Sequence, residues 1–210
     1  METKIKICGM KHPENILEIA ALQPDYLGFI FYAKSPRYVE NEIPTLDQSI
    51  QKVGVFVNAT LEEIMEKVTT HVLNLVQLHG EESPEFCSSL QQKKLKVIKS
   101  FNIDNLFNFN ILNKYFNSCD HFLFDTKGTN YGGNGTTFDW RILEKYSLDK
   151  PYLLSGGIGP DNITDLKDFF QKDYAKQCIA IDSNSQFEIE PGLKNPETIK
   201  TFMQNFKHTL

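Results

Sequence analysis

The chain has 210 residues, of which 40% are hydrophobic and 23% charged, a composition typical of a soluble globular protein. Twenty-seven acidic against 22 basic side chains give a formal net charge of −5, which disfavours a nucleic-acid surface but allows a local pocket for one phosphate. No apolar run approaches the roughly 20 residues of a membrane-spanning helix, and the first residues lack a signal peptide's apolar stretch. We expect one cytoplasmic domain over residues 1–210, with no nucleic-acid or membrane partner.

Eight short runs rich in β-branched and aromatic residues recur along the chain. Several are apolar almost throughout, which is typical of strands buried on both faces. The runs are residues 5–8, 26–31, 53–57, 73–78, 97–101, 121–125, 152–154 and 178–182.

Amphipathic helical patterns lie between several of these runs, and each opens on a capping residue or a proline. The start signals are Pro13-Glu14, Thr60, Ser83-Pro84, Asp161 or Asn162, and Asn195-Pro196. Residues 102–118, rich in Asn and Phe, fit either an irregular helix or a loop.

Strands that alternate with helices indicate an α/β protein with a parallel sheet and right-handed crossovers. Eight such units predict a closed (β/α)8 barrel, the TIM barrel, near the short end of that fold's size range. An open doubly wound sheet is the alternative, but its Gly-x-Gly-x-x-Gly fingerprint is absent after the first strand. The scattered cysteines and histidines show no metal-ligand spacing, so we expect no structural zinc.

In a barrel, function collects where the strands end and the following loops begin. Glycines after the seventh strand, Gly156 and Gly157, allow backbone N–H groups to approach a ligand. After the eighth strand, residues 185–188 (Ser-Gln-Phe-Glu) match a capping box and predict a short helix. Together these two loops predict a phosphate site; a tight turn beside an ordinary cap is the alternative.

Two candidate catalytic side chains end strands on different sides of the predicted barrel. Cys8 closes the first strand, and Asp125 ends the sixth after an apolar run. A lone strand cysteine is usually a small buried hydrophobe, and an aspartate there can simply cap its loop. Placed across one pocket, however, the two groups suit a general base and a general acid.

Three weaker candidates lie in loops at the same end of the predicted barrel. Arg37 follows a proline and could bind a carboxylate bidentately, or it could be a solvated surface arginine. His79 could orient or protonate a substrate, or satisfy backbone groups. Residues 131–135 (Tyr-Gly-Gly-Asn-Gly) could form a lid or a plain turn.

At these positions the sequence resembles the phosphoribosylanthranilate isomerases. The resemblance runs in order from the first strand to the last helix. The segments that carry it are Lys6-Ile7-Cys8-Gly9-Met10, Gly28-Phe29-Ile30-Phe31, Ser35-Pro36-Arg37-Tyr38-Val39, Gly54-Val55-Phe56-Val57-Asn58, Val76-Gln77-Leu78-His79-Gly80, Phe124-Asp125-Thr126-Lys127, Gly132-Gly133-Asn134-Gly135, Phe138-Asp139-Trp140, Leu154-Ser155-Gly156-Gly157-Ile158 and Asp182-Ser183-Asn184-Ser185 with Glu188.

The resemblance implies a TIM-barrel enzyme of tryptophan biosynthesis that acts on a small-molecule substrate without metal or organic cofactor. That family converts N-(5-phosphoribosyl)anthranilate to 1-(2-carboxyphenylamino)-1-deoxyribulose 5-phosphate by an Amadori rearrangement. Its general base falls on Cys8, its general acid on Asp125, and its anthranilate-carboxylate arginine on Arg37. We expect a monomer or homodimer.

The resemblance also assigns substrate-binding residues near the end of the chain. The family's phosphate loops fall on Gly156, Gly157, Asn184 and Ser185, and a sugar-hydroxyl partner falls on Asp182. The departures are modest: Ser183 stands where an aliphatic residue is usual, and Ala180 where a glycine often lies.

The acid–base roles of Cys8 and Asp125 require shifted pKa values, because a free cysteine titrates near about 8.5 and a free aspartate near about 3.9. We expect burial to raise the pKa of the carboxyl and positive charge or N–H dipoles to lower that of the thiol. Two alternatives stay open: another phosphosugar barrel isomerase, and a phosphate-binding barrel without catalysis. A metal-dependent epimerase would want several His and Asp ligands at strand ends, where only His79 offers an imidazole.

Overall fold

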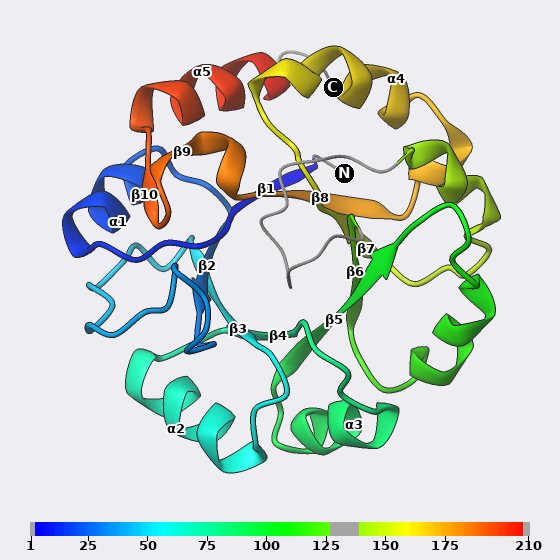
Figure 1. The fold of residues 1–210 in the computed structure, drawn as a ribbon, viewed down its shortest axis with the longest axis horizontal. Helices are drawn as coiled ribbons and strands as arrows, with labels where there is room; N and C mark the ends of the chain where they lie inside the picture. The colour runs from blue at the N-terminus through cyan, green and yellow to red at the C-terminus, as the bar shows by residue number, and fades with distance from the viewer. Residues whose placement is uncertain (1–2, 127–138, 208–210) are drawn as a thin grey trace.

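The protein forms a closed barrel of eight parallel strands in chain order, with β1 paired to both β2 and β8 (Figure 1). The computed structural model describes residues 3–126 and 139–207, so the predicted lid at residues 131–135 lies outside the described residues. The strands are β1 (Lys4–Ile7), β2 (Tyr26–Ile30), β3 (Gln51–Phe56), β4 (Leu75–Leu78), β5 (Lys96–Ile103), β6 (His121–Thr126), β7 (Tyr152–Leu154) and β8 (Cys178–Ser183). Each overlaps one of the eight predicted runs, and the TIM-barrel prediction is confirmed.

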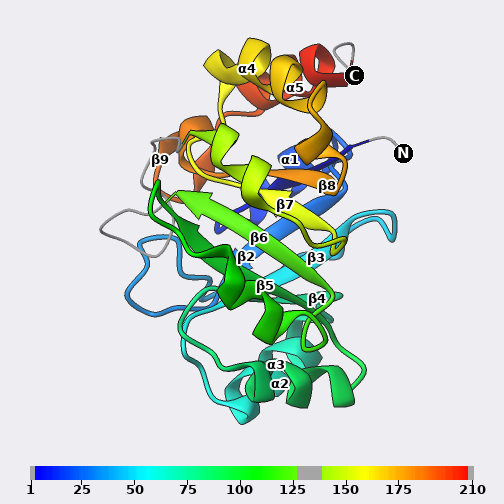
Figure 2. The same ribbon diagram turned by 90° about the vertical axis from the view of Figure 1, so that its right-hand side faces the viewer.

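Helices surround the barrel and begin where their start signals predict. They are α1 (Pro13–Ala20), α2 (Leu61–His71), α3 (Pro84–Gln92), α4 (Ile163–Phe170) and α5 (Pro196–Lys207). Thr60 and Glu63 form a reciprocal capping box at the start of α2, and the Ser83 hydroxyl accepts the Phe86 N–H at the start of α3. Figure 2 shows α4 and α5 on one side of the barrel and α2 and α3 on the opposite side.

Short 3₁₀ helices replace α-helices in several crossovers. They are η1 (Phe109–Tyr115), η2 (Trp140–Lys145), η3 (Pro160–Asn162), η4 (Asp173–Ala175) and η5 (Ser185–Phe187). Residues 102–118 thus contain the end of β5 and η1, which matches the irregular helix among the two readings. No helix in the described ranges is both long and apolar enough to cross a bilayer.

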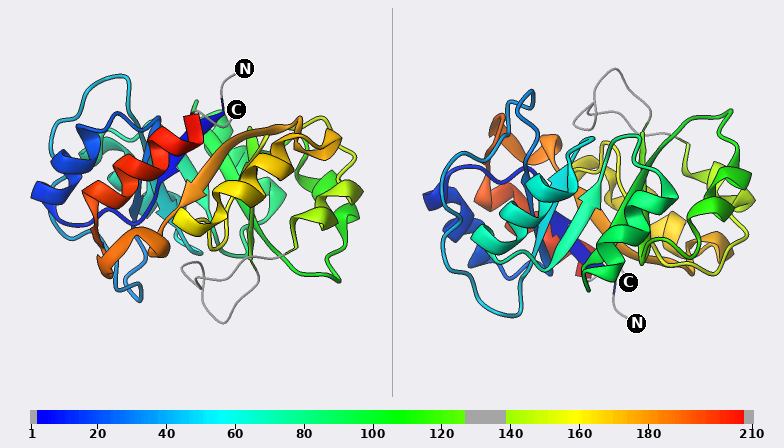
Figure 3. Two further views of the ribbon diagram at one scale, coloured as in Figure 1. Left: turned by 90° about the horizontal axis from the view of Figure 1, so that it is seen from above. Right: turned by 90° about the horizontal axis from the view of Figure 1, so that it is seen from below.

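The first and last helices close the outer ring. Helix α1 contacts α5, so the first and last helices lie side by side (Figure 1). In the side views of Figure 3, α4 and α5 lie in front in one panel and α2 and α3 in the other. The ring is therefore completed by segments that lie far apart in the sequence.

The barrel interior has an apolar floor. Seven strands each contribute one buried residue to it: Tyr26, Val53, Leu75, Ile98, Leu123, Leu153 and Ala180. A second, larger core lies between the outside of the strands and the helices. Because side chains alternate along a strand, the residue two positions after each floor residue also points inward, toward the C-terminal mouth.

The segment after β8 contains the predicted short helix, as a 3₁₀ turn, but not the predicted cap. Only the three-residue η5 follows the strand, and the predicted capping box is absent there. Glu188 instead starts β9 (Glu188–Glu190), which forms a hairpin with β10 (Leu193–Lys194). The Glu188 carboxylate binds Arg37, a partner 151 residues away that a local pattern cannot reveal.

Candidate functional site

A layer of polar side chains lies directly above the apolar floor. The residues two positions beyond the floor on β4, β5, β6 and β8 are Gln77, Ser100, Asp125 and Asp182. Each of them is buried. Buried polar groups at equivalent inward positions on four strands are costly unless they are paired with one another or with a ligand.

Lys6 of β1 completes this layer. Its side chain is fully buried, and its Nζ donates to Oδ1 of Asp182 over 2.8 Å. Burial disfavours the charge on both groups, but the charges of Asp182 and Cys8 raise the pKa of Lys6 above its ordinary value. The pKa of Asp182 is also raised, because burial outweighs the opposing effect of Lys6. Lys6 was not among the residues predicted for the site.

Cys8 lies at the end of β1, two residues after Lys6 and on the same face of the strand. Its Sγ packs against Gly28 of β2, where a Cβ atom would lie 2.7 Å from the sulfur. Burial raises the pKa of the Cys8 thiol, and the Lys6 ammonium only partly opposes that shift. The expected lowering of the thiol pKa is therefore wrong for the free protein.

Asp125, the residue before the last of β6, has its two carboxylate oxygens in different surroundings. Oδ1 accepts the N–H of Thr126 over 2.8 Å, the loop-capping contact considered from the sequence. Oδ2 lies 3.3 Å from Nε2 of His79. The direction of that contact does not make a hydrogen bond, and Nε2 has no hydrogen-bond partner within the described ranges. The other ring nitrogen, Nδ1, lies 3.2 Å from the amide nitrogen of Gln77, which orients the imidazole.

Arg37 is held in a second polar cluster, between the β2 loop and the β9–β10 hairpin. Its Nε and Nη2 donate to the two carboxylate oxygens of Glu188 over 2.8 and 2.7 Å. The buried ammonium of Lys194 lies 2.7 Å from Glu188 and also donates to the backbone and side-chain oxygens of Asn184. Burial alone would raise the pKa of Glu188, but the bonds from Arg37 and Lys194 lower it to about 2. Burial lowers the pKa of Lys194 to about 8.

The glycine loop after β7 lies against the segment after β8. A Cβ atom on Gly159 would lie 2.6 Å from the Cβ of Gln186 in η5, so the two loops are in contact. Gly156 has φ 94° and Gly157 φ 66°. Within residues 3–126 and 139–207, neither amide donates to a protein acceptor. Among the described residues the loop therefore offers two unused N–H donors, and its Gly159 end contacts η5, which begins at Ser185.

Comparison with known proteins decides the family. The model of the family described as "N-(5'phosphoribosyl)anthranilate (PRA) isomerase" matches residues 5–205. The chain belongs to the phosphoribosylanthranilate isomerase family. The resemblance seen in the sequence is thereby confirmed.

Relatives support this assignment over almost the whole chain. A protein of Parabacteroides distasonis named N-(5'-phosphoribosyl)anthranilate isomerase is 47% identical and aligns with 97% of this chain and 93% of its own length. A protein of the same name from Phocaeicola vulgatus is 41% identical and aligns with 98% of each chain.

Solved structures of phosphoribosylanthranilate isomerases have the same barrel. The Thermotoga maritima enzyme is 33% identical, with a TM-score of 0.82 over 99% of this chain and 100% of that one. A phosphoribosylanthranilate isomerase in complex with reduced 1-(o-carboxyphenylamino)-1-deoxyribulose 5-phosphate is 31% identical, with a TM-score of 0.79 and the same coverage. A further structure is of monomers generated from the dimeric Thermotoga maritima protein, with a TM-score of 0.76 and 99% of this chain covered.

Three residues of this phosphoribosylanthranilate isomerase site escaped the sequence prediction. Lys6 and Lys194 are buried lysines, and Glu188 was quoted in the resemblance but given no role beyond its local capping pattern. A signal existed for Lys6: it stands between two isoleucines in a buried strand and shares a face with Cys8. No such signal existed for Lys194, because the β9–β10 hairpin must form before its ammonium reaches Glu188 and Asn184.

Proposed function

We propose that this chain isomerises N-(5'-phosphoribosyl)anthranilate with Asp125 as general acid and Cys8 as general base. One observation carries the assignment of roles: Asp125 belongs to the polar layer built on Lys6 and Asp182, and Cys8 lies just above Lys6 on the same face of β1. A buried thiol and a buried carboxyl at one barrel mouth match the two proton transfers of an aldose–ketose rearrangement.

The first step is opening of the ribose ring. Asp125 donates a proton to the ring oxygen as the C1′–O bond breaks, and the nitrogen lone pair forms the C1′=N bond of an iminium ion. His79 Nε2 lies 3.3 Å from Oδ2 and has no hydrogen-bond partner among the residues that the structure describes, so it is available to a sugar oxygen. Asp125 ends this step as the carboxylate.

The second step is removal of the C2′ hydrogen. The active form carries Asp125 protonated and Cys8 already as the thiolate. The cationic iminium draws electrons from C2′, and its positive charge stabilises the thiolate beside it. The sulfur takes the proton, and the C–H electron pair forms the enolamine, which tautomerises to the ketone. Return of one proton from the thiol to Asp125 through water resets the site, so the reaction is a net isomerisation.

The remaining predicted residues bind the ends of the substrate. The free amides of Gly156 and Gly157, with Asn184 and Ser185, receive the phosphate, and Asp182 accepts a sugar hydroxyl. Arg37 uses one edge of its guanidinium for Glu188, which leaves the Nη1–Nη2 edge for the anthranilate carboxylate. We place the enzyme in the cytoplasm, as a monomer or homodimer.

A turnover assay tests this proposal. Freshly prepared phosphoribosylanthranilate is added to the purified protein, and loss of its fluorescence is followed. We expect turnover by the wild type, and a fall in kcat of well over about a hundredfold in Cys8→Ala and in Asp125→Asn, as for loss of a general base or acid. Cys178→Ala, which removes another buried thiol, is the control. Near-normal turnover in either site variant would remove that residue from the mechanism.

A further inference from the structure

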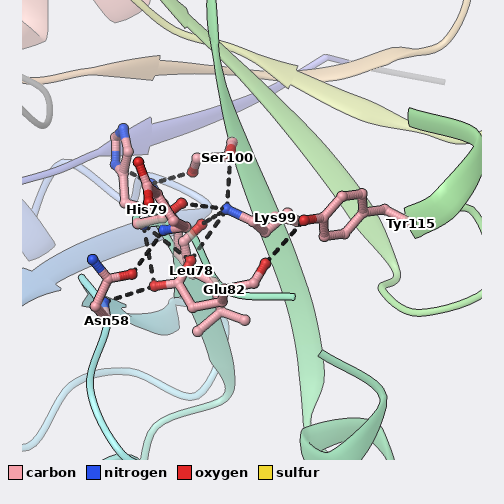
Figure 4. A network of polar contacts seen from close by, with 10 residues as sticks. Asn58, Leu78, His79, Glu82, Lys99, Ser100 and Tyr115 are labelled. Atoms are coloured by element: carbon pink, nitrogen blue, oxygen red, sulfur yellow. Dashed lines mark hydrogen bonds and ion pairs between the residues drawn. The ribbon is translucent and has the colours of Figure 1, made fainter. Parts of the chain in front are cut away.

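A buried ion pair lies outside the barrel interior, behind the loop that carries His79. Lys99 Nζ is 3.1 Å from Oε2 of Glu82, and each side chain is only 3% exposed (Figure 4). Lys99 alternates with the inward-facing Ser100 on β5, so its side chain leaves the barrel on the opposite face. It cannot touch a substrate in the chamber.

The Lys99 ammonium binds the backbone on either side of His79. It donates to the carbonyl oxygens of Leu78 over 3.3 Å and Gly80 over 2.8 Å, and to Ser100 over 3.1 Å. The His79 N–H itself donates to the Phe56 carbonyl of β3 over 2.8 Å. The peptide groups around His79 are therefore fixed from both neighbouring strands.

Glu82 fixes the same loop from its other end. Its carboxylate accepts the N–H of Gly80 and, over 2.9 Å, the N–H of Asn58 in the loop after β3. Asn58 returns a contact, since its Oδ1 accepts the N–H of Glu81 over 2.7 Å. Tyr115 donates to the Glu82 carbonyl oxygen, as Figure 4 shows. The loops after β3 and β4 are thus tied into one unit.

We propose that the Glu82–Lys99 pair consists of positioning residues, which hold the backbone around His79 so that its imidazole faces the Asp125 carboxylate. A buried ion pair is weak as a source of stability, because desolvation offsets most of the attraction. The hydrogen bonds of Lys99 and Glu82 instead go to the backbone groups on either side of His79, whose ring faces the barrel interior. The inference rests on the proposed role of His79 and Asp125 in the isomerisation.

The test is a kinetic double-mutant cycle with Lys99→Met and His79→Asn. Lys99→Met keeps most of the aliphatic side chain and removes the ammonium with its three carbonyl contacts. His79→Asn replaces the ring with a shorter group that cannot reach Asp125. We expect Lys99→Met to lower kcat by about 10- to 100-fold, the cost of a small misplacement, with KM within about twofold. In the His79→Asn background the same substitution should change kcat by less than about twofold.

A second readout does not depend on turnover. The imidazole ¹H–¹⁵N signals of His79, assigned by their loss in His79→Asn, should shift or broaden in Lys99→Met. Leu166→Ala, which creates a cavity beneath the buried face of α4 on the opposite side of the barrel from α3, should lower the melting temperature yet leave those signals and kcat unchanged. Glu82→Gln/Lys99→Met removes both charges and is the substitute if Lys99→Met does not fold.

The outcomes separate the two proposals. An unchanged kcat in both Lys99 variants, equal losses with and without His79, or unmoved His79 signals would overturn the positioning role. If the wild-type protein fails to turn over phosphoribosylanthranilate, the proposed function is wrong, whereas moved His79 signals in Lys99→Met would still support the structural link.

Discussion

The Lys6 ammonium lies 2.8 Å from the Asp182 carboxylate, and Cys8 stands two residues further along the same face of β1. The ion pair therefore lies directly beneath the thiol. Burial and the Asp182 carboxylate raise the pKa of Cys8, whereas the Lys6 ammonium lowers it. Of these influences, only the positive charge makes the thiolate easier to form.

Replacement of Lys6 should weaken the base. In Lys6→Met the Cys8 thiol loses the positive charge that most lowers its pKa, so its pKa rises further and kcat/KM at neutral pH falls by about tenfold or more, because less of the base is in its active form. The pH dependence of iodoacetamide alkylation at Cys8 measures the thiol directly. Lys4→Met, on the same strand but exposed, is the matched control. An unchanged alkylation profile in Lys6→Met would show that Lys6 does not act on the thiol.

The wild-type pH profile follows from the same shift. A general base must lose its proton before it acts, so a raised Cys8 pKa moves the rising limb of kcat/KM toward higher pH. We expect kcat/KM to rise through the range above about pH 8.5, the ordinary value for a cysteine thiol. Initial rates from about pH 6 to about pH 10 check this. If kcat/KM had already reached its plateau below neutral pH, the raised pKa of Cys8 would be contradicted.

The sequence was sufficient for the barrel because its signals are local. Strand runs such as Tyr152–Leu154 and helix caps such as Thr60 depend on neighbours within a few residues, and both are found as predicted. Strand ends also marked Cys8 and Asp125 as inward-facing at the mouth. Alternation along each strand carries that information without any knowledge of the partners.

Charged partners from distant segments were beyond such reasoning. Lys6 and Asp182 are 176 residues apart, and Arg37 and Glu188 are 151 apart. Glu188 shows the consequence, since its spacing from Ser185 satisfies a capping box while its carboxylate is bound by Arg37. The competing contact is bidentate and joins two charged groups, whereas a cap would join the carboxylate to one neutral N–H.

The glycine at position 156 should be indispensable for phosphate binding. With φ 94°, an added Cβ would lie 2.1 Å from Oγ1 of Thr126, so Gly156→Ala must displace the loop. We expect a higher KM and weaker inhibition by inorganic phosphate, each by about tenfold or more, because the two free amides move. Gly54→Ala crowds Leu73 and Phe56 instead and controls for lost stability. Normal phosphate inhibition in Gly156→Ala would place the anion elsewhere.

Glu188 should make the protein sensitive to acid. Its pKa of about 2 in the folded protein lies below the 4.5 of a free glutamate, so its contribution to stability is present above pH 4.5 and is lost as pH falls toward 2. Glu188→Gln should lower the free energy of unfolding by about 2 kcal/mol at neutral pH, as for a lost charged hydrogen-bond partner. The difference from wild type should shrink below pH 4.5. Urea unfolding at several pH values measures it, with the exposed Glu190→Gln as control. A difference that stays constant with pH would contradict the assignment.

Loss of Arg37 should affect binding more than turnover. Glu188 takes Nε and one Nη2 hydrogen, so three of the five guanidinium N–H donors remain for a substrate carboxylate. Arg37→Ala should therefore raise KM by about tenfold or more, with a smaller change in kcat, because Arg37 does not transfer a proton. Arg37→Lys should restore little, since an ammonium cannot bind Glu188 and a carboxylate bidentately at once.

The matched control for the Arg37 variants is Arg141→Ala. Arg141 also forks onto a carboxylate, that of Asp139, but its side chain is 80% exposed on η2. Its removal should leave KM unchanged, because an exposed pair of this kind contributes little and lies away from the β2 and β9 segments. A KM in Arg37→Ala equal to that of Arg141→Ala would mean that the anthranilate carboxylate is held by another group. In that case Arg37 would serve only to anchor the hairpin through Glu188.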